Sequence, residues 1–191
     1  MLSHDASTNL THGLLLSKTN DHEISTLIEA LKRKSGKCKH PLLLAVLIVE
    51  TVNNSISARI QTANYRLNEL EETMGQHEYI NRPMGNPLEL DFLSTTRRLN
   101  FIARTLAGEG MRIGATLLIL DKISRETREL ARAAEIDGTV LSSGTSVSDT
   151  SMIDEMVAHH VDACQNLALR AQYEEKRTQT QLGVVRNLLH C

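Results

Sequence analysis

Apolar side chains recur at alternating steps of three and four along three stretches of this 191-residue chain, and this spacing limits the possible folds more than any other feature. Such steps average close to 3.5, the period of the seam along which coiled-coil helices pack. The first stretch starts at Pro41, and Gly75 can cap it in the left-handed conformation. Its stripe consists of Val49, Val52, Ile56, Ile60, Ala63, Leu67, Leu70 and Met74.

The other two stretches have the same spacing. If the second is unbroken, it forms a helix of about 45 residues and about 70 Å, at ~1.5 Å per residue. Its stripe consists of Phe92, Thr95, Leu99, Ile102, Leu106, Ile113, Leu117, Leu120, Ile123, Thr127, Leu130 and Ala134. The third starts near Thr150, and its partly polar stripe consists of Ile153, Met156, His160, Ala163, Leu167, Ala171, Glu174, Arg177, Gln181, Val185 and Leu188.

The segments between these stretches cannot remain helical. Residues 81–87 contain two prolines and a glycine, and residues 142–151 form a tract of small polar side chains. Aromatic residues make up only 3% of the chain, which argues against a β-rich fold. We therefore predict an all-α fold, in which residues 41–191 form an elongated, coiled-coil-like, antiparallel three-helix bundle.

Three glycines fall inside the predicted second helix, at Gly108, Gly110 and Gly114. Each costs roughly 1 kcal/mol relative to alanine in a helix interior. We expect the helix to bend there, as a hinge would, or to approach another helix closely.

Residues 1–40 are expected to form a flexible leader, a short amphipathic helix that starts at Asp21, and a basic linker. The apolar face of that short helix consists of Ile24, Leu27, Ile28 and Leu31. Five cations with no acid among them form the basic patch: Lys32, Arg33, Lys34, Lys37 and Lys39. The patch can attract anionic lipid headgroups weakly, or it is an ordinary solvated linker.

Nucleic acid is not an expected partner, because the net charge is −2 and no aromatic residue interleaves the basic patch. Three widely separated cysteines predict free thiols in a reducing, cytoplasmic compartment. The longest apolar run, residues 42–49, is too short to span a bilayer, which needs about 20 residues.

His159, His160 and Cys164 are the candidate metal ligands, since His160 and Cys164 lie four apart on one helical face. No second pair of ligands is spaced to complete a shell, so the alternative is that His160 and Cys164 are semi-polar core residues. No catalytic or phosphate-binding motif occurs, and we predict that the chain is not an enzyme and has no resident cofactor.

Several polar residues border the predicted stripes. Asn53 and Glu71 fall outside the stripe of the first helix. Asn53, Asn64, Asn68 and Gln181 lie near a seam, where they either fix the helix register through polar contacts or face water.

Three segments resemble fungal CorA-like divalent-cation transporters: residues 40–50 (HPLLLAVLIVE), residues 70–75 (LEETMG) and residues 177–189 (RTQTQLGVVRNLL). The likeness covers roughly residues 40–189 and the cytosolic helical region of that family. It implies a proline-led helix, a long returning helix and a final helix that runs towards the membrane.

The sequence lacks two marks of that family, the pair of transmembrane helices and the Gly-Met-Asn pore signature. Met84, Gly85 and Asn86 have another order and lie between two prolines. No metal-binding residue can therefore be carried over, and the resemblance implies Mg²⁺ or another divalent cation only for a parent transporter. The chain is expected to be an isolated cytosolic part, a truncated gene model or a degenerate relative.

These observations predict a non-enzymatic association or regulatory domain that is cytoplasmic or lies at the cytosolic face of a membrane. The resemblance implies packing of the last helix against neighbouring subunits, and the expected self-association residues are Val184, Val185, Leu188 and Leu189. The alternative is a free-standing adaptor that binds a partner helix or a membrane surface.

Overall fold

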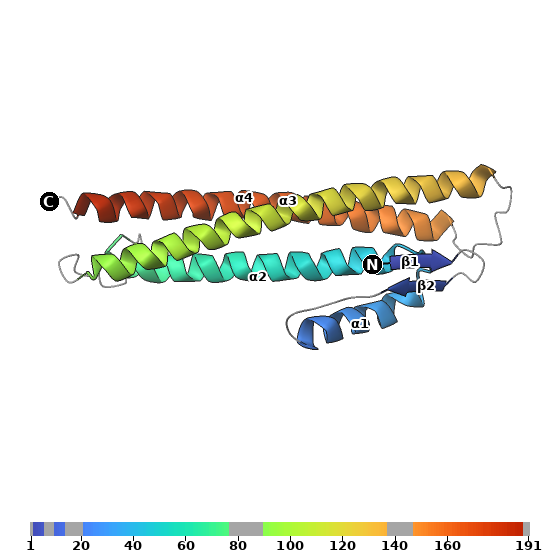
Figure 1. The fold of residues 1–191 in the computed structure, drawn as a ribbon, viewed down its shortest axis with the longest axis horizontal. Coiled ribbons are helices and arrows are strands. Elements are labelled where there is room, and N and C mark those ends of the chain that lie inside the picture. Colours follow the sequence, from blue (N-terminus) through green and yellow to red (C-terminus); the bar gives the residue numbers. More distant parts are fainter. Residues whose placement is uncertain (1, 6–9, 14–20, 77–89, 137–146, 189–191) are drawn as a thin grey trace. The chain divides into compact units, whose positions relative to one another are not determined.

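The computed structural model describes residues 2–5, 10–13, 21–76, 90–136 and 147–188. Within these ranges the chain forms four helices and two short strands (Figure 1). Their bounds are β1 Leu2–Asp5, β2 Leu10–Gly13, α1 Asp21–Ser35, α2 Leu43–Thr73, α3 Phe92–Ile136 and α4 Val147–Leu188. The prediction of a helical fold class is confirmed, and α1 begins at the residue where the short helix was expected.

The start of the chain differs from the expected loose leader. β1 and β2 pair antiparallel, with Leu2 opposite Gly13 and Asp5 opposite Leu10 (Figure 1). Backbone hydrogen bonds hold such a pair, and four residues are too few to show a clear alternation of apolar and polar side chains. Composition was therefore a poor guide to this segment.

The buried positions of the three long helices follow the 3.5 period closely. In α2 the seam consists of Val46, Val49, Asn53, Ile56, Ile60, Ala63, Leu67 and Leu70, and it continues at Met74 just after the helix; Leu43, Leu47 and Glu71 are buried as well. In α3 they are Thr95, Leu99, Ile102, Leu106, Glu109, Ile113, Thr116, Leu120, Ile123 and Thr127. In α4 they are Asp149, Ile153, Val157, His160, Cys164, Leu167, Ala171, Glu174, Thr178, Gln181 and Val185.

The structure corrects the predicted stripes where a polar residue occupies a seam position. If steps of three and four alternate strictly, the seam position before Ile56 is Asn53 and not Val52. Asn53 is buried, whereas Val52 is only half-buried. Glu71, which was also expected outside, is buried beside the seam. The sequence pattern followed apolar residues, whereas packing follows the geometry of the helix.

Two further corrections concern α4 and α3. In α4 the seam passes through Val157 and Cys164, while Met156 and Ala163 are half-buried on its flank. In α3, Leu130 is 41% exposed. Adjacent apolar pairs in a sequence do not show which member faces the neighbouring helices.

Local hydrogen bonds define the ends of α2 and α3. Gly75 has a φ of 69°, its amide donates to the Glu72 carbonyl at 3.1 Å, and the Gln76 amide donates to the Glu71 carbonyl at 2.8 Å. This pair of bonds is the Schellman motif, and the predicted glycine cap is confirmed. At the start of α3, Asp91 Oδ1 accepts a hydrogen bond of 3.0 Å from the Ser94 amide, which is an N-cap.

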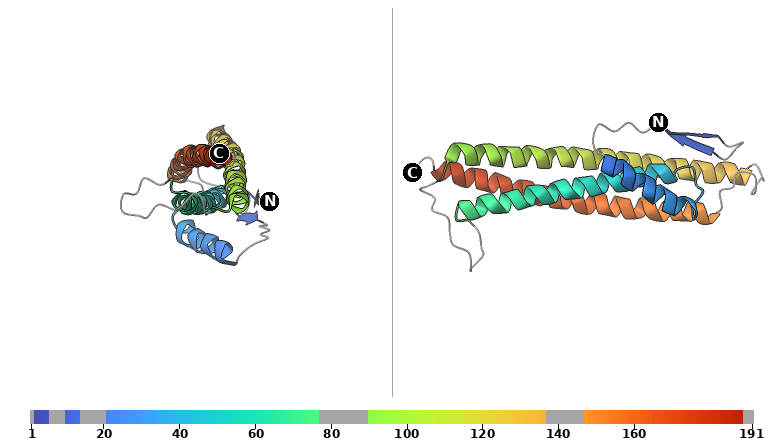
Figure 2. Two further views of the ribbon diagram at one scale, coloured as in Figure 1. Left: turned by 90° about the vertical axis from the view of Figure 1, so that its left-hand side faces the viewer. Right: turned by 90° about the horizontal axis from the view of Figure 1, so that it is seen from below.

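The described chain divides into two compact units, and each is treated by itself. Unit 2 consists of residues 55–114 and 165–191. Within it, α2 and α3 run antiparallel, because Arg59 pairs with Glu109 at 3.4 Å and Glu69 pairs with Arg98 at 3.6 Å. The α4 segment lies alongside α2 in this unit (Figure 2).

Unit 1 consists of residues 1–54 and 115–164. In this unit Lys34, near the end of α1, forms an ion pair of 3.1 Å with Glu50 of α2. Leu27 of α1 is buried, Ile24 and Leu31 are half-buried, and Ile28 is 46% exposed, so the predicted apolar face of α1 is only partly covered.

Candidate functional site

A polar cluster around Arg177 occupies the interior of unit 2. The guanidinium donates to both carboxylate oxygens of Glu71, through Nε at 3.1 Å and through Nη2. It also donates to Glu174 Oε2 at 2.9 Å, to Asn64 Oδ1 at 3.1 Å and to Asn68 Oδ1 at 2.6 Å. Arg177 therefore uses all five of its N–H groups.

The charges of this cluster do not balance, since one guanidinium faces two buried carboxylates. Burial raises the pKa of Glu174, and the neighbouring Arg177 acts in the opposite direction. Hydrogen bonds from Arg177 to Glu71 raise the pKa of Arg177 itself. Because every guanidinium donor is taken, the cluster fits a role in fixing helix register better than a role in holding a ligand.

Gln181 extends the cluster along α4. Its Nε2 donates to Glu71 Oε1 at 3.1 Å, while its buried Oε1 accepts no hydrogen bond from the described residues. Asn64, Asn68 and Gln181 therefore make contacts between helices, which was one of the two alternatives expected for them.

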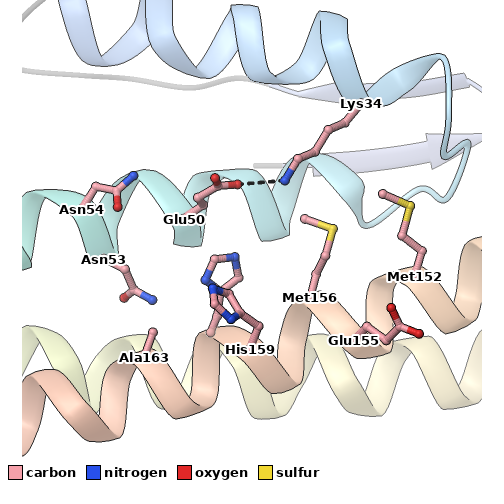
Figure 3. A pocket seen from close by; sticks show the side chains of 10 residues that line it. Lys34, Glu50, Asn53, Asn54, Met152, Glu155, Met156, His159 and Ala163 are labelled. Atoms are coloured by element: carbon pink, nitrogen blue, oxygen red, sulfur yellow. Dashed lines mark hydrogen bonds and ion pairs between the residues drawn. The ribbon is translucent and has the colours of Figure 1, made fainter.

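Unit 1 contains an open cleft of about 450 Å³ between α1, α2 and α4 (Figure 3). Ten residues line it: Lys34, Glu50, Asn53, Asn54, Met152, Glu155, Met156, His159, His160 and Ala163. Figure 3 shows the ion pair between Lys34 and Glu50 at one side and the side chains of Met152 and Met156 at another. The imidazoles of His159 and His160 and the thioethers of Met152 and Met156 therefore line the same cleft as Lys34, whose charge is paired with that of Glu50.

His160 is the most buried titratable side chain of the cleft, at 6% exposure. Burial lowers its pKa, and the negative charge of Glu50 acts in the opposite direction. Its ring lies 5.4 Å from that of His159, centroid to centroid, in an edge-on arrangement. Burial therefore favours the neutral form of the His160 imidazole.

The predicted metal set of His159, His160 and Cys164 is not brought together as a site. The Cys164 thiol donates to Asn53 Oδ1 at 3.3 Å and lies in the core, whereas His159 is exposed. Among the described residues, no three His, Cys, Asp or Glu side chains are placed to hold one metal ion. His160 and Cys164 are semi-polar core residues, as the alternative interpretation had it.

The thiols of Cys38 and Cys164 are free, as predicted, and both are buried. Burial raises the pKa of each. Since the thiolate is the reactive form, neither cysteine is set up as a nucleophile. Cys191 lies outside the described residues.

The basic patch lies at the end of α1 and in the turn that follows it. Lys34 is half-buried and pairs with Glu50. The other four members are exposed: Lys32, Arg33, Lys37 and Lys39. The patch is therefore accessible from solvent, although one of its five charges is neutralised within unit 1.

The predicted self-association residues at the end of α4 do not form an open surface. Val185 is 2% exposed, so it belongs to the core of unit 2. Val184 and Leu188 are half-buried, and Leu189 lies outside the described residues. The resemblance that suggested them carried no information about which side of the helix faces inwards.

An apolar outer face on α3, between residues 107 and 119, was not predicted from the sequence. Met111 is 75% exposed, Leu118 is 72% exposed and Ile119 is 52% exposed. The other positions of α3 that lie opposite its seam in this range carry only alanine and glycine: Ala107, Gly108, Gly114 and Ala115. Because all these residues lie on one uninterrupted helix, the outer face is a property of α3 itself.

The signal for this face is in the sequence. Once the seam is known, residues 107, 108, 111, 114, 115 and 118 fall opposite it, where a solvated helix carries polar residues. On either side of the face those positions carry charges, such as Arg104 and Asp121. The predicted close approach at Gly108 and Gly114 has no partner within unit 2, since a Cβ on either would meet no atom within 4 Å.

α2 is long and apolar enough, by length and composition, to cross a membrane, unlike any other helix of the described ranges. A core helix of a soluble protein meets the same criteria, and about 39% of its apolar stretch is buried here. Searches with family models, curated proteins and solved structures gave no significant match to this chain.

Proposed function

We propose that this chain is a non-enzymatic association domain, built as an antiparallel three-helix bundle, that pairs with a second copy of itself. The bundle is supported in unit 2 by the ion pairs between α2 and α3 and by the Arg177 cluster between α2 and α4. The observation that carries the association is the apolar outer face of α3. Large side chains that are more than half exposed on one face are typical of a contact surface.

A second copy fits this face because the face is self-complementary. If two α3 helices cross antiparallel about a two-fold axis at the level of residue 113, large side chains lie opposite small ones. Met111 then lies opposite Ala115, and Leu118 lies opposite Gly108. A two-fold interface needs this kind of matching within one surface.

The glycines are consistent with such a pairing. Gly108 and Gly114 lower the helix propensity of α3, yet no internal contact requires them. Opposite a second helix, they would let the backbones approach closely. The contact of one helix face falls at the low end of interface sizes, below about 1,200 Å², where weak and transient contacts are common, so we expect a reversible dimer.

The test is sedimentation velocity on the full chain over a concentration series. The wild type is expected to shift from monomer to dimer, and Met111→Lys with Leu118→Glu is expected to remain monomeric. Both side chains are exposed, so circular dichroism and thermal unfolding of the double variant should match the wild type.

Leu169→Lys is the matched control, since Leu169 is 65% exposed but lies on α4. This variant should dimerise like the wild type. A wild type that remains monomeric at high concentration contradicts self-association and favours the adaptor hypothesis. A dimer that survives in the double variant contradicts the assignment of the interface to α3.

The exposed basic residues favour a second candidate, weak contact with an anionic membrane surface. Its test is co-sedimentation of the chain with vesicles that contain phosphatidylserine, compared with a variant in which Lys32, Arg33, Lys37 and Lys39 are replaced by Gln. Equal binding of the two proteins contradicts it. The relation to CorA-like transporters stays a prediction, under which the domain would associate at the cytosolic face of a membrane.

A further inference from the structure

A cleft of about 320 Å³ lies between α2 and α3 within unit 2. On a helix, residues three and four apart are neighbours, with Cβ atoms about 5–6 Å apart. Arg97 and Arg98 therefore both lie within one helical turn of Phe101, on the α3 side of the cleft. The lining residues are Arg66 and Glu69 of α2 and Arg97, Arg98, Phe101 and Ile102 of α3.

The charges that line this cleft do not balance. Three guanidiniums and one carboxylate give it a net charge of +2. Glu69 pairs with Arg98 at 3.6 Å. Within the described ranges, neither Arg66 nor Arg97 forms an ion pair with a carboxylate. The positive potential of the cleft therefore favours an anion that carries more than one charge.

Two of the three guanidiniums are already held in place. The Cζ atom of Arg66 lies 5.7 Å from the centroid of the Phe101 ring, which is a cation–π contact. Arg98 is held by its ion pair with Glu69. Groups that are positioned before a ligand arrives lose less conformational entropy when it binds. The cleft is therefore partly organised for an anion.

Phe101 adds an aromatic surface beside these cations. The residue is 51% exposed although it lies next to the seam residue Ile102. An exposed aromatic ring is a stacking surface for a planar ligand, and a nearby arginine strengthens such a contact. The cleft thus combines an anion-binding part, Arg97 and Arg98, with an apolar planar part, Phe101.

We propose that this cleft binds a small phosphate monoester that carries a planar ring, such as a nucleoside monophosphate. A phosphate monoester carries a charge of about −1.5 to −2 at pH 7, which matches the excess charge of the cleft. The guanidinium fork suits phosphate oxygens, so Arg97 and Arg98 hold the phosphate. The ring of the ligand lies against the exposed part of Phe101.

The test follows the phenylalanine rings of the full chain by NMR, with ¹³C-labelled phenylalanine. The sequence contains two phenylalanines, so Phe92, which does not line the cleft, is an internal control. Adenosine monophosphate is expected to shift the Phe101 ring signals to saturation and to leave those of Phe92 in place. Ribose 5-phosphate should bind at least about 5-fold more weakly, because it lacks the base that stacks.

Variants are compared by isothermal titration calorimetry with adenosine monophosphate. Arg97→Gln with Arg98→Gln should lower the affinity at least about 10-fold, because hydrogen bonds from a charged donor to phosphate are lost. Both side chains are exposed, and circular dichroism checks the fold. Arg128→Gln with Arg132→Gln is the matched control, since it removes the same charge from exposed positions of α3 outside the cleft. This control should bind as the wild type does.

Three results would overturn the proposal. The first is a titration with adenosine monophosphate that does not saturate at millimolar concentration. The second is an equal loss of affinity in the two double variants, which would indicate general attraction to a positive surface. The third is stronger competition by vesicles that contain phosphatidic acid than by adenosine monophosphate, since this lipid headgroup has the phosphate but no ring.

Discussion

Removal of Arg177 should reveal how strongly the polar cluster of unit 2 depends on one side chain. In Arg177→Met, Glu71 and Glu174 lose their shared cation while they remain 8% and 7% exposed. Asn64 and Asn68 lose their donor at the same time. The variant therefore keeps two buried carboxylates without the cation that both of them contact; only the hydrogen bond from Gln181 to Glu71 and the more distant charge of Arg170 near Glu174 remain.

The expected loss of stability follows from burial. Removing one partner of a buried ion pair typically costs about 3–5 kcal/mol, much of it for the charge left behind. The Arg177 side chain is 24% exposed, so water can reach part of the vacated space, and we expect a loss near the lower end, about 3 kcal/mol. The loss should shrink as the pH falls and the carboxylates become protonated.

Urea denaturation at pH 7 and at lower pH measures these differences. Arg125→Met is the matched control, because Arg125 pairs with Asp121 at 2.8 Å but both side chains are about 60% exposed, at 62% and 59%. This change should cost less than about 0.5 kcal/mol. Adding Glu71→Gln and Glu174→Gln to Arg177→Met should restore at least half of the lost stability.

Two results would refute this reasoning. If Arg177→Met costs less than about 1 kcal/mol, the cluster behaves as a solvated surface pair. If the triple variant is as unstable as the single variant, the loss reflects packing of the arginine stem and not unpaired charge.

Three further predictions concern single positions. Asp91→Ala should destabilise the protein by about 1 kcal/mol in urea denaturation, because the Ser94 amide loses its cap, whereas Asp91→Asn should cost much less. Gly110→Ala should raise the melting temperature, since a Cβ there meets no atom within 4 Å and alanine gains about 1 kcal/mol of helix propensity; a lower value would show that the position is constrained. Burial raises the pKa of Glu174 above 4.5 in the folded state. The contribution of Glu174 to stability is therefore fully present below its pKa in the unfolded state, and it is lost as the pH rises through its pKa in the folded state. The wild type should lose stability relative to Glu174→Gln over that window, and a difference that is constant with pH contradicts this.

Local signals in the sequence were enough to locate the helices. A helix end depends on a few adjacent residues, so Gly75 and the start of α1 at Asp21 could be predicted without any tertiary information. The 3.5 period survives in the buried positions of all three long helices, because it follows from helix geometry and from the choice of apolar residues.

The candidate sites were much less predictable. Glu71 was expected outside the stripe, and for Asn53 a polar contact near the seam was one of two alternatives. The structure buries both, because residues 106 or more positions away supply their partners, Arg177 and Cys164. No local pattern contains such a pairing. The outer face of α3 could be found only after the seam had been assigned, because apolar residues are unusual only at positions that lie opposite the seam.

The sequence by itself therefore determined which segments form the long helices and that each carries one narrow stripe for packing. It also determined most of their ends, but α4 begins at Val147, inside the tract of residues 142–151 that was expected to be a loop. The tertiary structure decided which member of each adjacent pair enters the stripe, which polar groups meet inside it, and that Met152, Met156 and His160 share a cleft with Asn53 of another helix. The physical reason is the separation along the chain over which each effect acts. Helix propensity and capping act within a few residues, whereas burial and charge pairing depend on groups that the fold brings together from distant parts of the chain.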